Sequence, residues 1–248
     1  MIASVIVQLV NFLAALLFGM LGVGAAPVFI ASMEGLGYSV ISTIFPLAIL
    51  LNGINSGFAS IPFIKTRNVD WKYGSLLSVA AGIAAFTGAY YAFMVPVKVI
   101  MYLLVAVLLI LSAWVILNVK REGVSIEAKR VFSAGLPGAI FAGFIGGLLA
   151  IGGGGIMMPF LLISGYNTKK AAGTTAIIAT VASFAGFAGF VMHSFIPLNF
   201  LILSASLVAI ASVIGAFLSI KLAKPSWLRM LLALILLVSA LRIAITLI

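Results

Sequence analysis

Long runs of residues without a single charge cover most of this chain of 248 residues. The runs comprise residues 1–33, 35–64, 73–97, 99–119, 131–168 and 171–220. About 20 apolar residues in a helix cross the hydrocarbon core of a bilayer, which is about 30 Å thick. Only 7% of the residues are charged and 65% are hydrophobic, whereas about 25% of a soluble domain is charged. The composition excludes a soluble globular domain, a disordered chain and a disulfide-rich secreted scaffold, and it predicts a multi-pass membrane protein.

The spanning elements are expected to be α-helices, because a helix satisfies its backbone polar groups within the segment. The alternation of polar and apolar residues that is typical of a membrane β-barrel is absent. Without cysteine, the chain has neither disulfides nor thiolate metal sites. A net charge of +10 in a soluble protein would suggest nucleic-acid binding. In a membrane protein we interpret it through the placement of the charges, and we expect no nucleic-acid partner.

One apolar stretch is too long for a single crossing. A helix over 131–163 would be about 50 Å long. In its middle stand four consecutive glycines, Gly152–Gly155, and each weakens a helix by about 1 kcal/mol relative to alanine. We therefore expect a helix, a glycine turn and a short second helix. The stretch 1–33 has the same form, with Gly19, Gly22 and Gly24 before its last apolar residues.

The two halves of the chain resemble each other at a constant offset of 128 residues. The aligned residues are Gly19 with Gly147, Gly24 with Gly152, Gly37 with Gly165, Tyr38 with Tyr166, and Ala48-Ile49 with Ala176-Ile177. Identity elsewhere is weak, but the matches fall on unusual residues. Internal repeats of this kind are common in secondary transporters.

The positive-inside rule compares two topologies. Eight plain transmembrane helices, with parallel repeats, would divide the fourteen Lys and Arg residues eight to six. Three crossings per half plus a re-entrant hairpin at each glycine break would make the repeats inverted. The division then becomes twelve to two, with only Lys98 and Arg242 on the poor side. We prefer the inverted arrangement in the cell membrane, with the basic loops cytoplasmic and both termini outside; eight plain helices are the alternative.

The expected fold is an all-α integral membrane protein of two repeats. The first repeat, 1–120, has a hairpin at about 1–33 and helices at about 39–64, 73–95 and 98–119. A basic cytoplasmic loop follows at 121–130. The second repeat, 131–248, has a hairpin at about 131–163 and helices at about 168–193, 198–220 and 227–248.

The glycine breaks are candidate binding elements. A helix that starts inside the bilayer exposes backbone N–H groups and the positive end of its dipole. In an inverted repeat, two such starts can face each other and hold one anion. The candidate residues are Gly22 and Gly24 in the first break and Gly152, Gly153, Gly154 and Gly155 in the second. The alternative is that these glycines only allow close helix packing.

Neutral polar residues follow each break. Asn52, Asn55 and Ser56 follow the first; Gly173, Thr174, Thr175, Thr180 and Ser183 follow the second. Amides and hydroxyls can bind an oxyanion without a buried charge. Asn52 and Asn55 are three residues apart and share a helix face. For a single Ser or Thr, bonding to its own helix backbone is the commoner role.

Acidic residues are missing from the apolar stretches, since Glu34, Asp70, Glu122 and Glu127 lie in or beside loops. A carboxylate proton relay, a metal site and a cofactor site therefore have no candidates. No catalytic residues are predicted either, and the glycine run lacks the Gly-Lys-Ser/Thr ending of a P-loop. The single histidine, His193, sits at a predicted helix end. Lys169 and Lys170 either attract anions to the inner mouth or only signal topology.

The segment Gly143–Pro159, GFIGGLLAIGGGGIMMP, resembles the glycine-rich motif of the TauE/SafE family of sulfite exporters. Residues 171–175, AAGTT, are similar to the Ala-x-Gly-Thr-Ser stretch of that family, with Thr175 in place of Ser. In the first half, Ala25-Ala26 replaces glycines and Phe45-Pro46-Leu47 stands where Gly-Thr-Ser is expected. The resemblance covers nearly the whole chain. It implies an integral membrane permease that exports sulfite or related sulfur oxyanions and organosulfonates.

The sequence thus predicts a secondary transporter that moves a small sulfur-containing anion outward through the lipid bilayer. An anion leaving a cell that is negative inside gains about 2.3 kcal/mol per charge per 100 mV, so no proton relay is required. The alternatives are an anion channel of the same architecture and a non-transporting membrane scaffold protein. The sequence does not determine which anion is transported, which ion is coupled to it or what the oligomeric state is. A homo-oligomer is one of the open alternatives.

Overall fold

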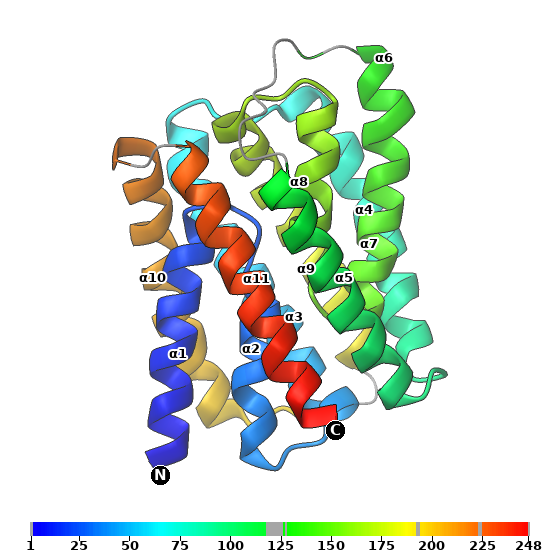
Figure 1. The fold of residues 1–248 in the computed structure, drawn as a ribbon, viewed down its shortest axis with the longest axis vertical. Coiled ribbons are helices and arrows are strands. Elements are labelled where there is room, and N and C mark those ends of the chain that lie inside the picture. Colours follow the sequence, from blue (N-terminus) through cyan, green and yellow to red (C-terminus); the bar gives the residue numbers. More distant parts are fainter. Residues whose placement is uncertain (1, 118–125, 127, 192–193, 223–224, 248) are drawn as a thin grey trace.

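The structure of the chain, a computed structural model, is helical in every regular element of the part that it describes (Figure 1). It describes residues 2–117, 126, 128–191, 194–222 and 225–247. The segments are helical because each backbone N–H and C=O must be satisfied within its own segment in a bilayer. No strand occurs in these ranges.

Each half of the chain has five main helices in the same order, with short helical turns at different places. The first half contains α1 (Ile2–Gly19), α2 (Ala26–Met33), η1 (Glu34–Leu36), η2 (Val40–Ile44), α3 (Phe45–Lys65), α4 (Trp71–Ala92) and α5 (Val97–Leu117). The second half contains α6 (Ala128–Arg130), η3 (Val131–Gly135), α7 (Leu136–Leu148), α8 (Gly154–Ile163), α9 (Thr168–Val191), α10 (Leu198–Leu222) and α11 (Pro225–Leu247). The π-helical turn η2 runs directly into α3, as η3 runs into α7.

Six helices among the described residues are long and apolar enough to cross a membrane. They span Val40–Lys65, Trp71–Ala92, Val97–Leu117, Ala128–Leu148, Thr168–Val191 and Leu198–Lys221. The chain is therefore a multi-pass membrane protein. Large hydrophobic side chains are exposed around the bundle, such as Ile83 and Ile110 at 66% each, and this surface suits contact with lipid acyl chains.

Both glycine stretches interrupt a helix. The chain leaves the helical conformation between α1 and α2, at residues 20–25, and between α7 and α8, at residues 149–153. Gly22 and Gly24 have positive φ in the first break, and Gly152 and Gly153 in the second. Glycine adopts this left-handed conformation at little cost. Figure 1 shows α2 turning back beside α1, and α8 turning back beside α7.

Backbone conformation repeats between the halves at the offset of 128 residues. Positive φ angles occur at the pairs Gly22 and Ala150, Gly24 and Gly152, and Gly37 and Gly165. Ala150, with φ of 57°, is one of only two non-glycine residues of this kind in the described ranges. The two breaks therefore share a backbone path as well as sequence.

Helix contacts repeat in the same way. A β-carbon added at Gly215 would lie 2.0 Å from the Leu16 carbonyl oxygen, where α10 crosses α1. One added at Gly88 would lie 2.1 Å from the Phe144 carbonyl oxygen, where α4 crosses α7. Small residues let membrane helices approach this closely. The crossing of α1 with α10 thus has the same construction as the crossing of α7 with α4.

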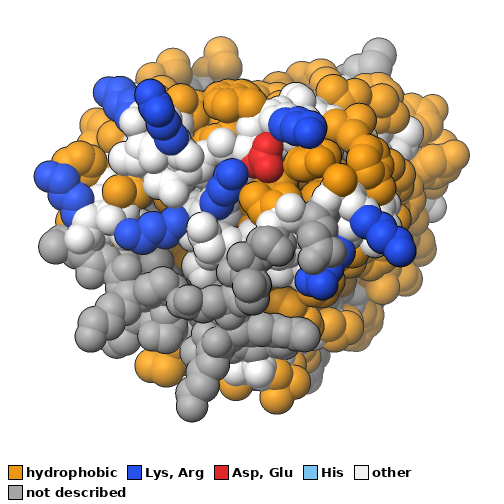
Figure 2. Space-filling view, turned by 90° about the horizontal axis from the view of Figure 1, so that it is seen from above, with side chains coloured by type: hydrophobic (Ala, Val, Ile, Leu, Met, Phe, Trp, Pro, Cys, Tyr) orange, Lys and Arg blue, Asp and Glu red, His pale blue; other side chains and the backbone are white. Residues whose placement is uncertain are grey.

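Charges divide sharply between the two ends of the bundle. Figure 2 looks onto one end, named here the basic end, where lysine and arginine side chains gather. Its described cations lie at the ends of α3, α4, α6, α9 and α10: Lys65, Arg67, Lys72, Lys129, Arg130, Lys169, Lys170 and Lys221. The start of α1 and the end of α11 lie at the opposite end (Figure 1). The opposite end has Glu34, Lys98 and Arg242.

Candidate functional site

Asn52 joins three elements at the centre of the bundle. Its Oδ1 accepts a hydrogen bond of 2.9 Å from the backbone N–H of Ala26, the first residue of α2. Its Nδ2 donates a bond of 2.9 Å to Ser183 Oγ on α9. Asn52 and Ser183 are both fully buried. An amide in an apolar interior is costly without partners, and this one links the first break to the second half of the chain.

Both glycine breaks pack against this amide. A β-carbon added at Gly24 would lie 2.2 Å from Asn52 Oδ1, and one added at Gly152 would lie 2.3 Å from Asn52 Nδ2. Neither position can therefore hold a side chain while Asn52 keeps its place. The breaks also touch each other, since a β-carbon at Gly154 would lie 2.4 Å from the Val23 carbonyl oxygen. The two interruptions predicted from the sequence therefore meet at Asn52.

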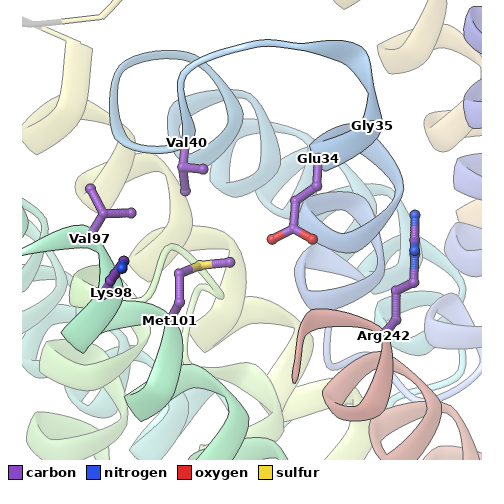
Figure 3. Close-up of a pocket in the computed structure, with 7 residues that line it drawn as sticks. All are labelled: Glu34, Gly35, Val40, Val97, Lys98, Met101 and Arg242. Atoms are coloured by element: carbon purple, nitrogen blue, oxygen red, sulfur yellow. The ribbon is translucent and has the colours of Figure 1, made fainter. Parts of the chain in front are cut away.

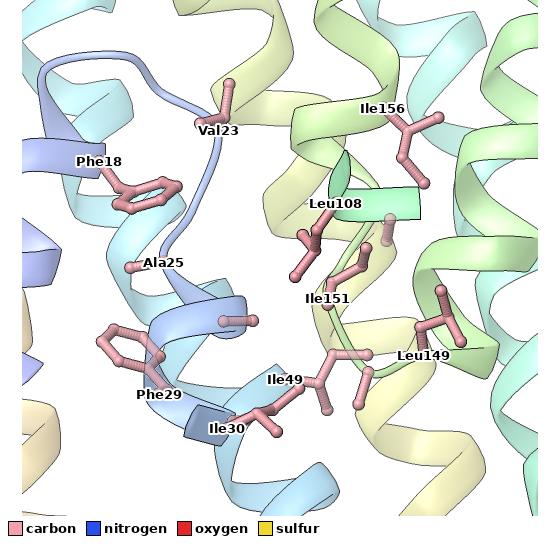
Figure 4. Close-up of a cluster of buried hydrophobic side chains, with 14 of the residues drawn as sticks. Phe18, Val23, Ala25, Phe29, Ile30, Ile49, Leu108, Leu149, Ile151 and Ile156 are labelled. Carbon is pink, nitrogen blue, oxygen red and sulfur yellow. The ribbon is translucent and has the colours of Figure 1, made fainter. Parts of the chain in front are cut away.

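Apolar side chains surround the meeting point. Figure 4 shows Val23, Ala25 and Phe29 on the side of the first break and Ile151 and Ile156 on the side of the second. All five are at most 5% exposed. Hydrogen bonds and dipoles act more strongly in such a low-dielectric interior than in water.

The first turns of α2 and α8 differ in one respect. Neither helix is capped by the side chain of its own N-cap residue. The first N–H of α2 donates to Asn52 Oδ1, whereas the first turn of α8 has no such bond to a described side chain. The N–H groups of Gly154, Gly155 and Ile156 form that first turn, where the helix dipole is positive. Around Gly155 there is room, because the nearest atom to an added β-carbon is Leu111 Cδ1 at 3.9 Å. Of the two starts, that of α8 therefore has a position that accepts a β-carbon without displacing a neighbour.

The two predicted threonines have different surroundings. Thr175 Oγ1 is buried and has no hydrogen-bond partner. Thr174 Oγ1 accepts a bond of 3.0 Å from the backbone N–H of Asp70, in the connection between α3 and α4. Beside it, a β-carbon on Gly173 would lie 2.1 Å from the Asn68 carbonyl oxygen. Thr174 therefore holds this connection against α9, while the Thr175 hydroxyl is left for another partner.

Asn55 lies apart from the breaks, although it shares a face of α3 with Asn52. Its Nδ2 donates to the Ala15 carbonyl, at 2.9 Å, and to Ser212 Oγ, at 2.6 Å. These partners belong to α1 and α10. Its Oδ1 is buried without a partner. The structure brings Gly24 and Gly152 against Asn52, whereas Gly22 packs on Ala172 of α9 and Gly153 on Ala142 of α7. Asn55 lies at a neighbouring helix contact.

Lys169 and Lys170 lie at the start of α9. Lys169 Nζ donates a bond of 3.0 Å to the Ile220 carbonyl near the end of α10, where a cation also complements the helix dipole. Lys170 is half-buried, and its backbone N–H bonds to Asn167 Oδ1. In this conformation Lys169 ties two helices together.

A polar cluster at the basic end was missed in the sequence. Tyr166 Oη donates a bond of 2.9 Å to Asp70 Oδ2, and Asp70 Oδ1 caps α4 by accepting from the N–H groups of Lys72 and Tyr73. Burial and the adjacent Asp70 carboxylate raise the pKa of Tyr166 above its ordinary value. The cluster ties the α3–α4 connection to the α8–α9 connection. The one signal for Tyr166 in the sequence is its alignment with Tyr38 at the offset of 128 residues.

The chemistry at the centre consists of donors and hydroxyls. The two described acidic residues, Glu34 and Asp70, lie in the connections at opposite ends. Among the described residues there is no group of three His, Cys, Asp or Glu that could hold a metal ion. His193 lies outside the described residues. Amide, hydroxyl and backbone N–H groups without a carboxylate suit an anion or a neutral polar molecule.

Comparison with known proteins identifies similarity to membrane transporters. The model of the sulfite exporter TauE/SafE family matches residues 7–243. The probable membrane transporter protein y4hK of Sinorhizobium fredii is 27% identical, over 94% of both chains. A probable membrane transporter protein of Haemophilus influenzae is 24% identical, over 68% of this chain and 66% of its own length. No solved structure matches the chain.

Proposed function

The chain belongs to the sulfite exporter TauE/SafE family, and from this premise we propose that it is a secondary transporter that exports a small sulfur-containing anion, sulfite or a related organosulfonate. Relatives that are named as probable membrane transporters support membrane transport as the general function. The chemical class of the substrate is proposed from the family and from the hydrogen-bond donors at the centre of the bundle.

One observation carries the proposal: the two helix breaks meet at a buried amide, beside an uncapped helix start. The N–H groups of Gly154, Gly155 and Ile156 can donate to oxyanion oxygens. The unpartnered Thr175 hydroxyl supplies a further donor within α9. A carboxylate here would repel an anion, and the acidic side chains of the described residues lie elsewhere.

The membrane topology is part of the proposal. Residues 1–120 and 131–248 form two inverted repeats, in which α1–α2 and α7–α8 are hairpins that enter the bilayer from opposite sides. The matched φ angles and the matched helix crossings support this arrangement. The basic end faces the cytoplasm, as the positive-inside rule requires, and both termini lie outside.

Export proceeds by opening the buried centre to one side at a time. Asn52 and Ser183 are fully buried, so substrate enters only when the ends of the bundle move. On the cytoplasmic side the connection Arg67–Asp70, held by Thr174 and Tyr166, is the segment that opens. The membrane potential supplies about 2.3 kcal/mol per charge per 100 mV for an anion that leaves.

Flux of sulfite from proteoliposomes tests the proposal. Purified protein is reconstituted with [35S]sulfite inside, and efflux is followed under an imposed potential that is negative inside. We expect flux that saturates with sulfite concentration. Flux that rises linearly without saturation would instead establish an anion channel. Absence of flux, together with an unchanged melting temperature in sulfite, thiosulfate, sulfate, sulfoacetate and phosphate, would establish a non-transporting role.

A further inference from the structure

A cavity of about 300 Å³ lies at the end of the bundle opposite the basic end. Its lining comes from the α2–η1 corner, η2, the start of α5 and the end of α11: Glu34, Gly35, Val40, Val97, Lys98, Met101 and Arg242. Figure 3 shows the Glu34 carboxylate turned into the cavity, with Lys98 on one side and Arg242 on the other. Among the described residues, these three are the charged side chains of this end.

The two cations are unexpected at this end. Of the ten Lys and Arg side chains that the structure describes, eight lie at the basic end, and the positive-inside rule favours such a one-sided distribution. Lys98 and Arg242 depart from that rule. They come from helices of different halves, yet they border the same cavity. Because two cations and one carboxylate border the cavity, its net charge is positive and attracts anions.

One face of α5 connects this cavity to the centre of the bundle. Met101 lines the cavity. Ten residues further along α5, Leu111 Cδ1 lies 3.9 Å from the position of a β-carbon added at Gly155. Leu104 and Leu108 lie between them on the same buried face. At 1.5 Å per residue, the cavity is about 15 Å from the start of α8.

We propose that this cavity is a second anion-binding site, an outer vestibule in which Lys98 and Arg242 hold a small sulfonate or sulfite-type anion. The planar guanidinium of Arg242 can donate two parallel hydrogen bonds to such an oxyanion, while Lys98 acts as a point charge. The Glu34 carboxylate keeps the net charge low, so that a monoanion is bound weakly and released. Its role as the exit station rests on the proposed function; its binding of anions does not.

Charge-selective labelling tests the vestibule directly, because the chain has no cysteine of its own. Val97 lines the cavity and is 40% exposed, so Val97→Cys serves as the reporter. Leu198→Cys, at the start of α10 and 65% exposed, is the control outside the cavity. The full-length purified protein reacts with a sulfonate-bearing or a trimethylammonium-bearing methanethiosulfonate, in the presence or absence of methanesulfonate.

We expect Val97→Cys to favour the anionic reagent about tenfold more than Leu198→Cys does, which is the scale at which a charged cleft raises local anion concentration. Methanesulfonate slows this reaction, and adding Lys98→Gln or Arg242→Gln abolishes the preference. Equal charge selectivity at the two cysteines, or no protection by methanesulfonate, would overturn the proposal. Sulfite flux of the same proteins reports on the proposed function separately, since the labelling needs no transport.

Discussion

Gly155 differs from its three glycine neighbours in what it can tolerate. Gly152 and Gly153 have positive φ, and a β-carbon at Gly154 would lie 2.4 Å from the Val23 carbonyl oxygen. A substitution at any of these three disturbs the fold, so lost activity there has no clear meaning. At Gly155 the nearest atom to an added β-carbon is 3.9 Å away. Its replacement therefore tests ligand proximity.

Gly155→Leu is expected to fill the space beside the first turn of α8 and to lower sulfite efflux about tenfold or more, with the melting temperature nearly unchanged. Losing one hydrogen bond to a charged ligand costs about 1.5–3 kcal/mol. Gly154→Ala is the contrasting variant, in which the melting temperature falls. Wild-type efflux in a folded Gly155→Leu protein would show that no anion approaches α8.

The bond between Tyr166 and Asp70 gives a pH dependence. Because the pKa of Tyr166 is raised in the folded protein, its stabilisation is complete below the ordinary tyrosine pKa of about 10 and is lost as the pH rises above it. Tyr166→Phe removes this contribution. We expect the variant to be about 1 kcal/mol less stable at pH 8, and its melting temperature to fall less between pH 10 and 11. Parallel curves for both proteins would contradict this account.

The binding roles of Asn52, Asn55 and Thr174 stay predictions, but the structure separates their positions: Asn52 lies at the meeting point of the breaks, and the other two lie at different contacts. Spacing places both amides on one face of a helix, and α3 presents that face to two sets of neighbours. Asn52 therefore contacts α2 and α9, and Asn55 contacts α1 and α10. Thr174 serves a connection from the other half of the chain. Contacts between residues 104 positions apart leave no periodic pattern in the sequence.

Helices and their interruptions could be predicted because two strong physical preferences set them. The bilayer requires helices wherever charge is absent, and consecutive glycines weaken a helix. The π-helical turns at Val40–Ile44 and Val131–Gly135 were not predicted, because they depend on tertiary packing. Partners were not predictable either, since an apolar helix face has no mark of which helix covers it.

Because the crossing of α1 with α10 is equivalent to that of α7 with α4, we expect a substitution at either crossing to reduce stability by a similar amount. Gly215→Ala and Gly88→Ala each place a methyl group within 2.1 Å of a carbonyl oxygen. Overpacking of this kind costs about 1–3 kcal/mol, so we expect both melting temperatures to fall by similar amounts. Gly57→Ala is the control, because its β-carbon would meet Thr180 Cγ2 at an ordinary 3.4 Å. Loss of stability in only one half would contradict equivalent crossings.

At the scale of the whole molecule, the distribution of charges and the duplication both favour inverted repeats with hairpins at the glycine breaks. Twelve of fourteen cations gather on one side only if the glycine breaks are hairpins. The described cations of that side form the basic end of the bundle (Figure 2). Counting charges in the sequence yields the twelve-to-two division as a prediction, whereas the meeting of the two breaks depends on how the halves pack and has no signal in the sequence.

Single cysteines in this cysteine-free chain report its orientation. Asn167, which is exposed, adjoins the basic end, and Phe195, 65% exposed, lies in the connection between α9 and α10 at the opposite end. In intact cells we expect an impermeant maleimide to label Phe195→Cys and to leave Asn167→Cys unlabelled until the cells are opened. Labelling of Asn167→Cys from outside would reverse the proposed orientation.

The central claim is that the amide at the meeting point of the two breaks serves anion transport. The most direct measurement is the rate of [35S]sulfite efflux from proteoliposomes for Asn52→Leu and for Gln8→Leu. Gln8 is the matched control, since it is also buried and bonds Ser204 Oγ at 2.8 Å, where α1 meets α10. We predict that Asn52→Leu lowers the rate about tenfold or more, and that Gln8→Leu stays near the wild-type rate. Equal rates in the two folded variants would contradict the claim.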